Sequence, residues 1–136
     1  MNASEAINAW QLAAHPEGGF FRETYRSALT VTPPGWSADR SLVTSILYLL
    51  PYGERSAWHR VRGEELWLWQ GGSAMGLFVD DEVHRVGPDV ADGESLQVLV
   101  PSGSWQSAAP VGGEWSLVAC VVAPGFDYAD FELRDG

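Results

Sequence analysis

The chain has 136 residues and a mass of 14.8 kDa, and 46% of its residues are hydrophobic against 19% that are charged. This length and composition predict one folded domain over residues 1–136 and exclude a disordered chain. With 18 acidic and 8 basic side chains the net charge is −10, so electrostatic repulsion excludes nucleic acid and anionic membrane surfaces as partners.

The first segment is predicted to be a short helix. Ser4 is suited to cap it, and apolar residues then recur at helical spacing as far as Ala14. Pro16 and the pair Gly18-Gly19 end the helix. No apolar run approaches the roughly 20 residues of a membrane-spanning helix.

The compartment is predicted from cysteine usage and from the start of the chain. The single cysteine, Cys120, cannot form an internal disulfide, which suits a reducing environment. The first residues show neither the basic cluster nor the apolar core of a secretory signal. We therefore expect a cytoplasmic protein.

Beyond the helix, short strand-like runs alternate with turn-forming residues. Strands are predicted at residues 20–27, 42–50, 56–61, 65–70, 74–79, 82–86, 96–100, 105–109, 115–122 and 130–134. No helix-length segment separates them, so the predicted fold class is all-β, an antiparallel sandwich or closed barrel. Asp80-Asp81 is expected to form a two-residue hairpin turn. Residues 28–41 are expected to form one long loop, of the kind that serves as a lid or a partner contact.

The first candidate for chemistry is a histidine and a glutamate on consecutive predicted strands. His59 lies near the end of one strand and Glu65 begins the next, so a tight hairpin between them would place both side chains on one face. Such a pair can bind a divalent metal or act as an acid–base pair. Without further signals, a plain ion pair in a polar patch is the more common arrangement.

The spacing around this pair resembles the two sequence motifs of the cupins. The first motif is matched by Gly53, His59, Glu65 and Gly72, and the second by the run from Pro101 to Gln106. Metal-binding cupins typically offer three histidines and one glutamate, but here Val61 and Gln106 stand in two of the histidine positions. Because Gln106 would coordinate only weakly through its carbonyl oxygen, and Val61 not at all, His59, Glu65 and Gln106 would hold Zn, Fe, Mn or Ni loosely.

Further blocks resemble the cupin-5 family of RmlC-like cupins, long labelled a domain of unknown function. They are His15–Ser27, Trp58–Val61, Val100–Gln106 and Ala123–Tyr128. In this family Val61 and Gln106 are ordinary residues at their positions. The resemblance implies a double-stranded β-helix, or jelly-roll barrel, with a short N-terminal helix. It also implies a homodimer and a pocket for a small-molecule substrate that is not generally established.

Two residues of the first predicted strand are candidates for binding a substrate. Strict alternation puts Arg22 and Tyr25 on opposite faces. An inward Arg22 would bind a carboxylate or phosphate with its guanidinium, and Tyr25 would then lie in a subunit interface. The reverse assignment stays open, as does a solvated edge strand.

Tyr48 and Trp67 are the aromatic candidates. The hydroxyl of Tyr48 would act as an acid or donor if it reached the cavity, although a core tyrosine is more frequent. Trp67 follows Glu65 by two residues and should point the same way, where it would form an aromatic wall for a flat ring or a sugar face. Plain filling of the barrel is the alternative for Trp67.

Three functions follow from these residues. The first is an isomerase-, epimerase- or lyase-type enzyme in which His59 is the general base, Glu65 orients it and Gln106 donates to an oxyanion. In that enzyme Arg22 anchors a polar or anionic, sugar- or nucleotide-like substrate and Trp67 stacks on it. The second is a non-catalytic binder of a similar metabolite, and the third is a weakly metal-dependent enzyme.

Overall fold

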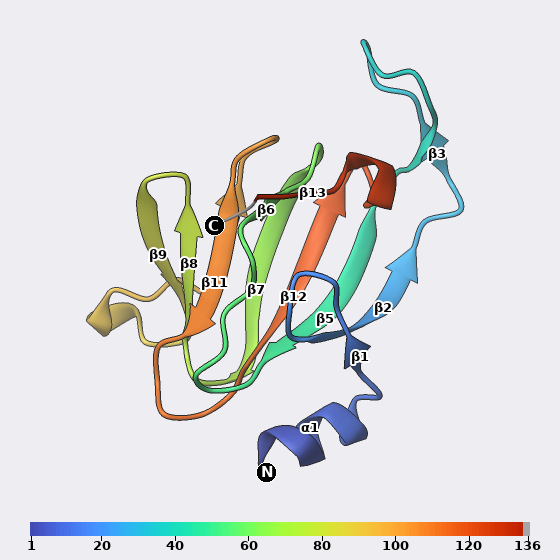
Figure 1. Ribbon diagram of the computed structural model, residues 1–136. Coiled ribbons are helices and arrows are strands. Elements are labelled where there is room, and N and C mark those ends of the chain that lie inside the picture. The colour runs from blue at the N-terminus through green and yellow to red at the C-terminus, as the bar shows by residue number, and fades with distance from the viewer. Residues whose placement is uncertain (135–136) are drawn as a thin grey trace.

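The computed structural model describes residues 1–134, and its main body is two antiparallel sheets that face each other (Figure 1). The strands of the first sheet, in spatial order, are β1 (Ala13–Ala14), β2 (Phe20–Arg26), β5 (Thr44–Leu50), β12 (Ser116–Ala123), β7 (Glu64–Gly72) and β10 (Gln97–Val100). Those of the second sheet are β13 (Glu132–Leu133), β6 (His59–Arg60), β11 (Gln106–Pro110), β8 (Met75–Val79) and β9 (Glu82–Val86). The remaining elements are the helix α1 (Ala3–Ala9), the hairpin of β3 (Thr30–Val31) and β4 (Arg40–Ser41), and the 3₁₀ turns Val90–Asp92 and Tyr128–Asp130.

The main core lies between the two sheets and explains why both are needed. Leu50 and Val118 come from the first sheet, and Leu77 and Ala108 from the second, and all four are buried in one cluster. Neither sheet could cover its apolar face alone, because a sheet must bury that face against another layer. The all-β prediction is confirmed.

The N-terminal helix is confirmed but is shorter than predicted. Asn2, not Ser4, caps it, because the Asn2 side chain accepts from the backbone nitrogen of Glu5 while the Glu5 carboxylate accepts from the backbone nitrogen of Asn2. Gln11 has a left-handed φ of 56°, which ends the helical path. Residues 13–14 then pair with β2 as a strand. Within residues 1–134, no helix is long and apolar enough to cross a membrane.

The predicted hairpin between His59 and Glu65 is wrong. The predicted strand 56–61 shortens to β6, which pairs with β11 and β13, whereas β7 pairs with β12 and β10 in the other sheet. The chain changes sheets at Gly63, where a side chain would lie 2.5 Å from the carbonyl oxygen of Pro124. His59 and Glu65 therefore approach each other from opposite sheets.

The two predicted connections, Asp80-Asp81 and residues 28–41, have different structures. Asp80-Asp81 forms the two-residue turn between β8 and β9, with Val79 opposite Glu82 and a φ of 50° at Asp80, so this prediction is confirmed. Residues 28–41 contain the short hairpin of β3 and β4 and extend away from the two sheets (Figure 1).

Candidate functional site

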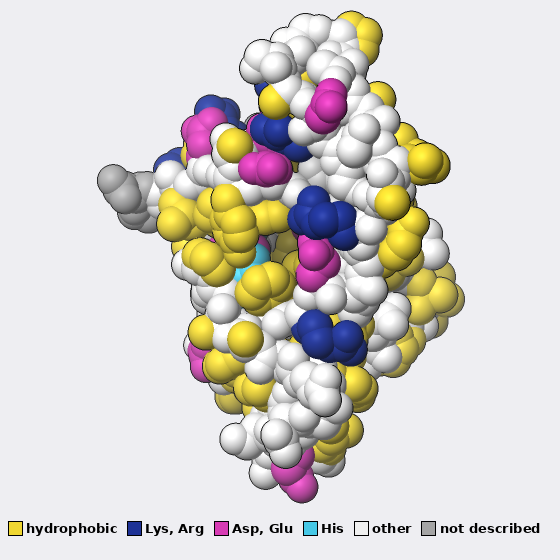
Figure 2. Space-filling model, turned by 90° about the vertical axis from the view of Figure 1, so that its right-hand side faces the viewer, with side chains coloured by type: hydrophobic (Ala, Val, Ile, Leu, Met, Phe, Trp, Pro, Cys, Tyr) yellow, Lys and Arg dark blue, Asp and Glu magenta, His cyan; other side chains and the backbone are white. Residues whose placement is uncertain are grey.

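A cavity of about 610 Å³ opens beside the core, with a size typical of small-molecule sites. Its floor includes the buried titratable side chains that line it: His15, Glu17, His59, Glu65 and the thiol of Cys120. Hydrocarbon side chains line the middle, namely Phe21, Ile46, Val61, Val122, Phe126 and Phe131. Figure 2 shows a histidine at the bottom of this hollow, ringed by hydrophobic side chains, with arginine and acidic side chains along one rim.

His59 comes from β6 and is held in one tautomer. Its Nδ1 lies 2.8 Å from the carbonyl oxygen of Ala57, and because a carbonyl only accepts, Nδ1 carries the proton. Nε2 then carries the lone pair, and no side chain or backbone group within residues 1–134 hydrogen-bonds to it. Burial lowers the pKa of His59 from 6.5 to about 4, although the bond to Ala57 opposes this effect. The imidazole is therefore neutral at physiological pH.

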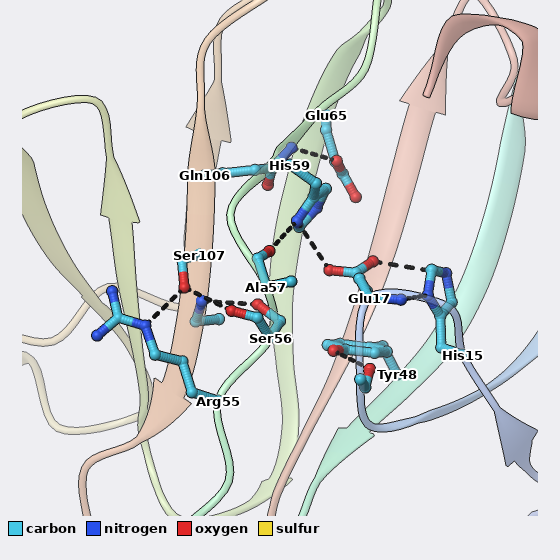
Figure 3. A network of polar contacts seen from close by, with 12 residues as sticks. His15, Glu17, Tyr48, Arg55, Ser56, Ala57, His59, Glu65, Gln106 and Ser107 are labelled. Carbon is cyan, nitrogen blue, oxygen red and sulfur yellow. Dashed lines mark hydrogen bonds and ion pairs between the residues drawn. The ribbon is translucent and has the colours of Figure 1, made fainter. Parts of the chain in front are cut away.

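Glu65 comes from β7 and is held by a buried chain of donors. Its Oε1 accepts from Nε2 of Gln106 at 2.8 Å (Figure 3). Oε1 of Gln106 in turn accepts from Nε1 of Trp67 at 2.9 Å. Burial raises the pKa of Glu65 to about 7, against the hydrogen bonds from Gln106 and Cys120, which lower it. Near neutral pH the carboxyl is thus present in both protonation states.

Glu17 and His15 complete the floor, and sequence reasoning missed both. Oε2 of Glu17 lies 3.0 Å from Nδ1 of His59, and Oε1 lies 3.5 Å from Nε2 of His15 (Figure 3). His15 also accepts, through Nδ1, from the backbone nitrogen of Glu17. Since the Nδ1 proton of His59 is directed at Ala57, Oε2 of Glu17 receives no hydrogen bond from residues 1–134.

Glu17 and His15 also favour their uncharged forms. Burial raises the pKa of Glu17 well above its usual range, and repulsion from Glu65 adds to the effect. Burial, then repulsion from His59, lowers the pKa of His15 to about 4. The floor of the cavity is therefore a set of largely neutral acids and bases inside an apolar surrounding. Perturbed groups of this kind gather at functional sites.

The turn that presents Glu17 depends on two glycines. Gly19 has a φ of 76°, and a side chain there would lie 2.8 Å from the carbonyl oxygen of Leu49 and 2.9 Å from the hydroxyl of Tyr48. That hydroxyl donates to the carbonyl oxygen of Gly18 at 2.6 Å, which fixes the turn against β5. The run from His15 to Gly19 was the available sequence signal, because paired glycines mark a turn that brings backbone close to other atoms.

We expect Gly19→Ala to lower the free energy of unfolding by about 2 kcal/mol or more, because alanine resists a positive φ and has no room here. Urea denaturation measures this loss. The matched control is Gly113→Ala, where a side chain would meet nothing within 4 Å, and a change below about 0.5 kcal/mol is expected. Equal losses in the two variants would show that the turn is not held as described.

The structure brings together part of the predicted site. His59 and Glu65 line the cavity, and Arg22 lies at its rim. Gln106 is fully buried behind Glu65, so it orients that carboxyl rather than facing a ligand. Its predicted donation to an oxyanion is therefore wrong, because its amide donates to Glu65.

The aromatic candidates lie outside the cavity. Trp67 is 1% exposed within the core, so the predicted aromatic wall is wrong and the barrel-filling alternative is correct. Tyr48 is likewise a core residue, with its hydroxyl bound to Gly18. Tyr25 is 55% exposed and does not line the cavity, so its assignment to substrate binding is wrong. Its place in a homodimer interface stays a prediction.

Alternation along β2 fails because the strand contains a bulge. The register against β5 shifts between Glu23 and Tyr25, so Thr24 is an extra residue. The bulge places Arg26 on the same face as Phe21 and Glu23, which strict alternation would not allow, and these three residues border the cavity. Arg22 shares the other face with Tyr25 and reaches the cavity only at its rim.

The predicted metal ligands do not fit Zn, Fe, Mn or Ni. The indole nitrogen of Trp67 can only donate, so the carbonyl oxygen of Gln106 must face Trp67, and its NH₂ group faces Glu65. The side chain of Val61 is hydrocarbon. Among residues 1–134, no three side chains of histidine, cysteine, aspartate or glutamate converge to hold a metal ion. His59 and Glu65 alone are fewer donors than a stable site requires.

Comparison with known proteins identifies relatives over nearly the whole chain. An uncharacterized protein of Saccharomyces cerevisiae is 34% identical over 97% of this chain and 75% of its own length. A hypothetical protein from Leishmania major is 32% identical, with a TM-score of 0.91 over 98% of this chain and 88% of its own. A protein from Shewanella oneidensis is 36% identical, with a TM-score of 0.90 over 99% and 85%.

The family follows from a match that spans the two sheets and the site. The model of the family described as Cupin superfamily (DUF985), Cupin_5, matches residues 4–134, which include His15, Glu17, His59 and Glu65. The fold is the double-stranded β-helix of the cupins. The chain therefore belongs to the Cupin_5 family of the cupin superfamily.

Proposed function

We propose that the protein is an enzyme that transfers protons on a small molecule, in an isomerase-, epimerase- or lyase-type reaction. The observation that supports this most is the pairing of His59 and Glu65 on one cavity. His59 presents an unprotonated Nε2, and the pKa of Glu65 is about 7, so a base and an acid are both available near neutral pH.

In the proposed step, Nε2 of His59 removes a proton from the carbon next to a carbonyl group. The protonated carboxyl of Glu65 gives its proton to the carbonyl oxygen, so the C–H electron pair forms the carbon–carbon double bond of an enol. Return of a proton to either face of the α-carbon gives back the carbonyl compound or its epimer. Where the α-carbon also carries a hydroxyl, the enol is an enediol, and protonation of the former carbonyl carbon with loss of the other hydroxyl proton gives an isomer. The newly ionised Glu65 stabilises the imidazolium of His59 until the proton returns.

Glu17 and Gln106 act as positioning residues in this scheme. Gln106 donates to Oε1 of Glu65 and makes no hydrogen bond to Oε2. Oε2 of Glu17 lies 3.0 Å from Nδ1 of His59, so Glu17 contacts that side of the ring and helps to hold its orientation. No step uses a metal, because the donors present do not fit one.

A second candidate function is non-catalytic binding. The hydrocarbon middle of the cavity favours it, since apolar walls bind a ligand without taking part in its chemistry. Under this alternative, His59→Ala would weaken ligand binding although the wild type transforms no candidate.

Deuterium exchange tests the proposal without knowledge of the natural substrate. The probes are enolisable ketones, with acetophenone as the first, followed by proton NMR in D₂O at pH 7. We expect the wild type to accelerate loss of the methyl signal, and His59→Gln to slow it by about 100-fold or more. The control is His84→Gln, on β9 outside the cavity, which should exchange like the wild type. Equal rates for wild type and His59→Gln would contradict the proposal.

A further inference from the structure

The lining of the cavity changes character with depth. The floor holds the buried acids and bases, and exposed polar side chains surround the mouth, among them Arg22, Glu23, Arg26 and Asp127. Most of the other lining side chains are hydrocarbon, and the half-buried ones include the rings of Phe21, Phe126 and Phe131. Hydrophobic side chains surround the hollow in Figure 2. A ligand that spans the cavity must therefore be polar at both ends and apolar in its middle.

The middle of the cavity disfavours a sugar. Thr44 is the one hydroxyl side chain among the buried lining residues, and its Oγ1 already accepts from the backbone nitrogen of Phe126. Hydroxyl groups placed against Phe21, Val61 or Val122 would lose their bonds to water without replacement, which costs free energy. Flat apolar rings, by contrast, suit aromatic walls.

The mouth offers one arginine that is not neutralised. Arg26 donates to Glu23 at 2.6 Å and to the carbonyl oxygen of Phe126 at 3.0 Å. Arg22 donates through Nε to the carbonyl oxygen of Trp10 at 2.9 Å, which fixes its guanidinium plane. Its two terminal nitrogens have no carboxylate partner within residues 1–134 and remain available for an anion.

From these three layers we infer that the ligand is an amphipathic carboxylate with an aromatic or similarly flat apolar body. Its carboxylate binds Arg22 at the mouth, its body lies between the hydrocarbon walls, and its opposite end reaches His59 and Glu65. The carbonyl at that opposite end rests on the proposed function, whereas the carboxylate and the apolar body do not. Glu23 is paired with Arg26, but Asp127 at the same mouth disfavours a second negative charge, so the ligand is a monoanion.

The test compares 4-acetylbenzoate with acetophenone, which lacks only the carboxylate, by isothermal titration calorimetry. We expect the wild type to bind 4-acetylbenzoate at least tenfold more tightly than acetophenone. Arg22→Gln should abolish this difference, and Arg22→Lys should keep part of it because the charge remains. Arg85→Gln, on β9 away from the cavity, is the matched control and should keep the full difference.

Equal affinities of the wild type for the two probes would overturn the inference, as would a preference that survives Arg22→Gln. Tighter binding of a neutral sugar such as glucose would also overturn it. Binding that depends on Arg22 without deuterium exchange would uphold this inference and contradict the proposed enzyme. Deuterium exchange of acetophenone, together with equal affinities for the two probes, would uphold the proposed enzyme and contradict this inference.

Discussion

Replacing Trp67 with alanine is expected to lower the free energy of unfolding by about 3–5 kcal/mol. Trp67 is 1% exposed at the centre of the main core, where its ring meets Tyr48 edge-on at a centroid distance of 6.0 Å. The truncation opens a cavity and also removes the donor to Gln106, whose buried oxygen is then unsatisfied. Urea denaturation at pH 7 measures the loss.

Trp67→Phe separates the packing of the ring from its hydrogen bond. Phenylalanine keeps most of the apolar volume, so the expected loss is about 1–3 kcal/mol, the cost of an unsatisfied buried acceptor. Because Gln106 is then no longer fixed, the pKa of Glu65 should also change. A loss below 1 kcal/mol in Trp67→Ala would show that this residue is not a core residue, and the cavity lining would need to be reassigned.

Replacing Glu65 with glutamine is expected to stabilise the protein by about 3 kcal/mol at pH 8 and to have little effect near pH 4.5. The pKa of Glu65 rises from 4.5 to about 7 on folding, so the folded protein retains a proton that the unfolded chain releases between these values. Stability therefore falls as pH rises through this window. Glutamine has no proton to lose and avoids the fall.

The contribution of His15 and His59 to the free energy of unfolding changes with pH in the opposite direction to that of Glu65. The pKa values of His15 and His59 fall from 6.5 to about 4 on folding, so their contribution to stability increases with pH between these values and is constant above 6.5. The two effects oppose each other from about pH 4.5 to 6.5. Above that range the raised pKa values of Glu65 and Glu17 dominate, and the wild type loses stability.

Unfolding midpoints of wild type and Glu65→Gln, measured from pH 4.5 to 9, test this account. Glu114→Gln is the control, because Glu114 is an exposed residue outside the cavity. A Glu65→Gln midpoint that runs parallel to that of the wild type at every pH would contradict the raised pKa of Glu65.

The sequence allowed the strands and turns to be predicted because their signals are local. Alternating apolar residues and the Asp80-Asp81 turn depend only on neighbours in the chain, and the structure confirms them. The partner of β6 could not be predicted in this way, because strand pairing depends on where distant segments such as β11 and β13 pack. His59 and Glu65 do border one cavity, but they approach it from facing sheets instead of from one hairpin.

The site was only partly predictable for a related reason. His15 directly precedes Pro16, where the helix was predicted to end, and that position alone gives no sign of a buried base. In the structure the helix ends at Ala9, and burial lowers the pKa of His15. Glu17 had no signal of its own besides the adjacent glycine pair. The sequence also could not show that Trp67 lies in the core. Alternation along a strand tells which face a side chain is on, but not whether that face meets a cavity or the core.

The central feature of the account is a neutral His59 that turns the lone pair of Nε2 to the cavity beside Glu65. Long-range proton–nitrogen NMR of the histidine side chains, followed from pH 3.5 to 8, measures its protonation and tautomer directly. We expect His59 to show the Nδ1–H tautomer at pH 7 and to gain a second proton only near pH 4. An imidazolium at pH 6, or a proton on Nε2 of the neutral ring, would contradict the account.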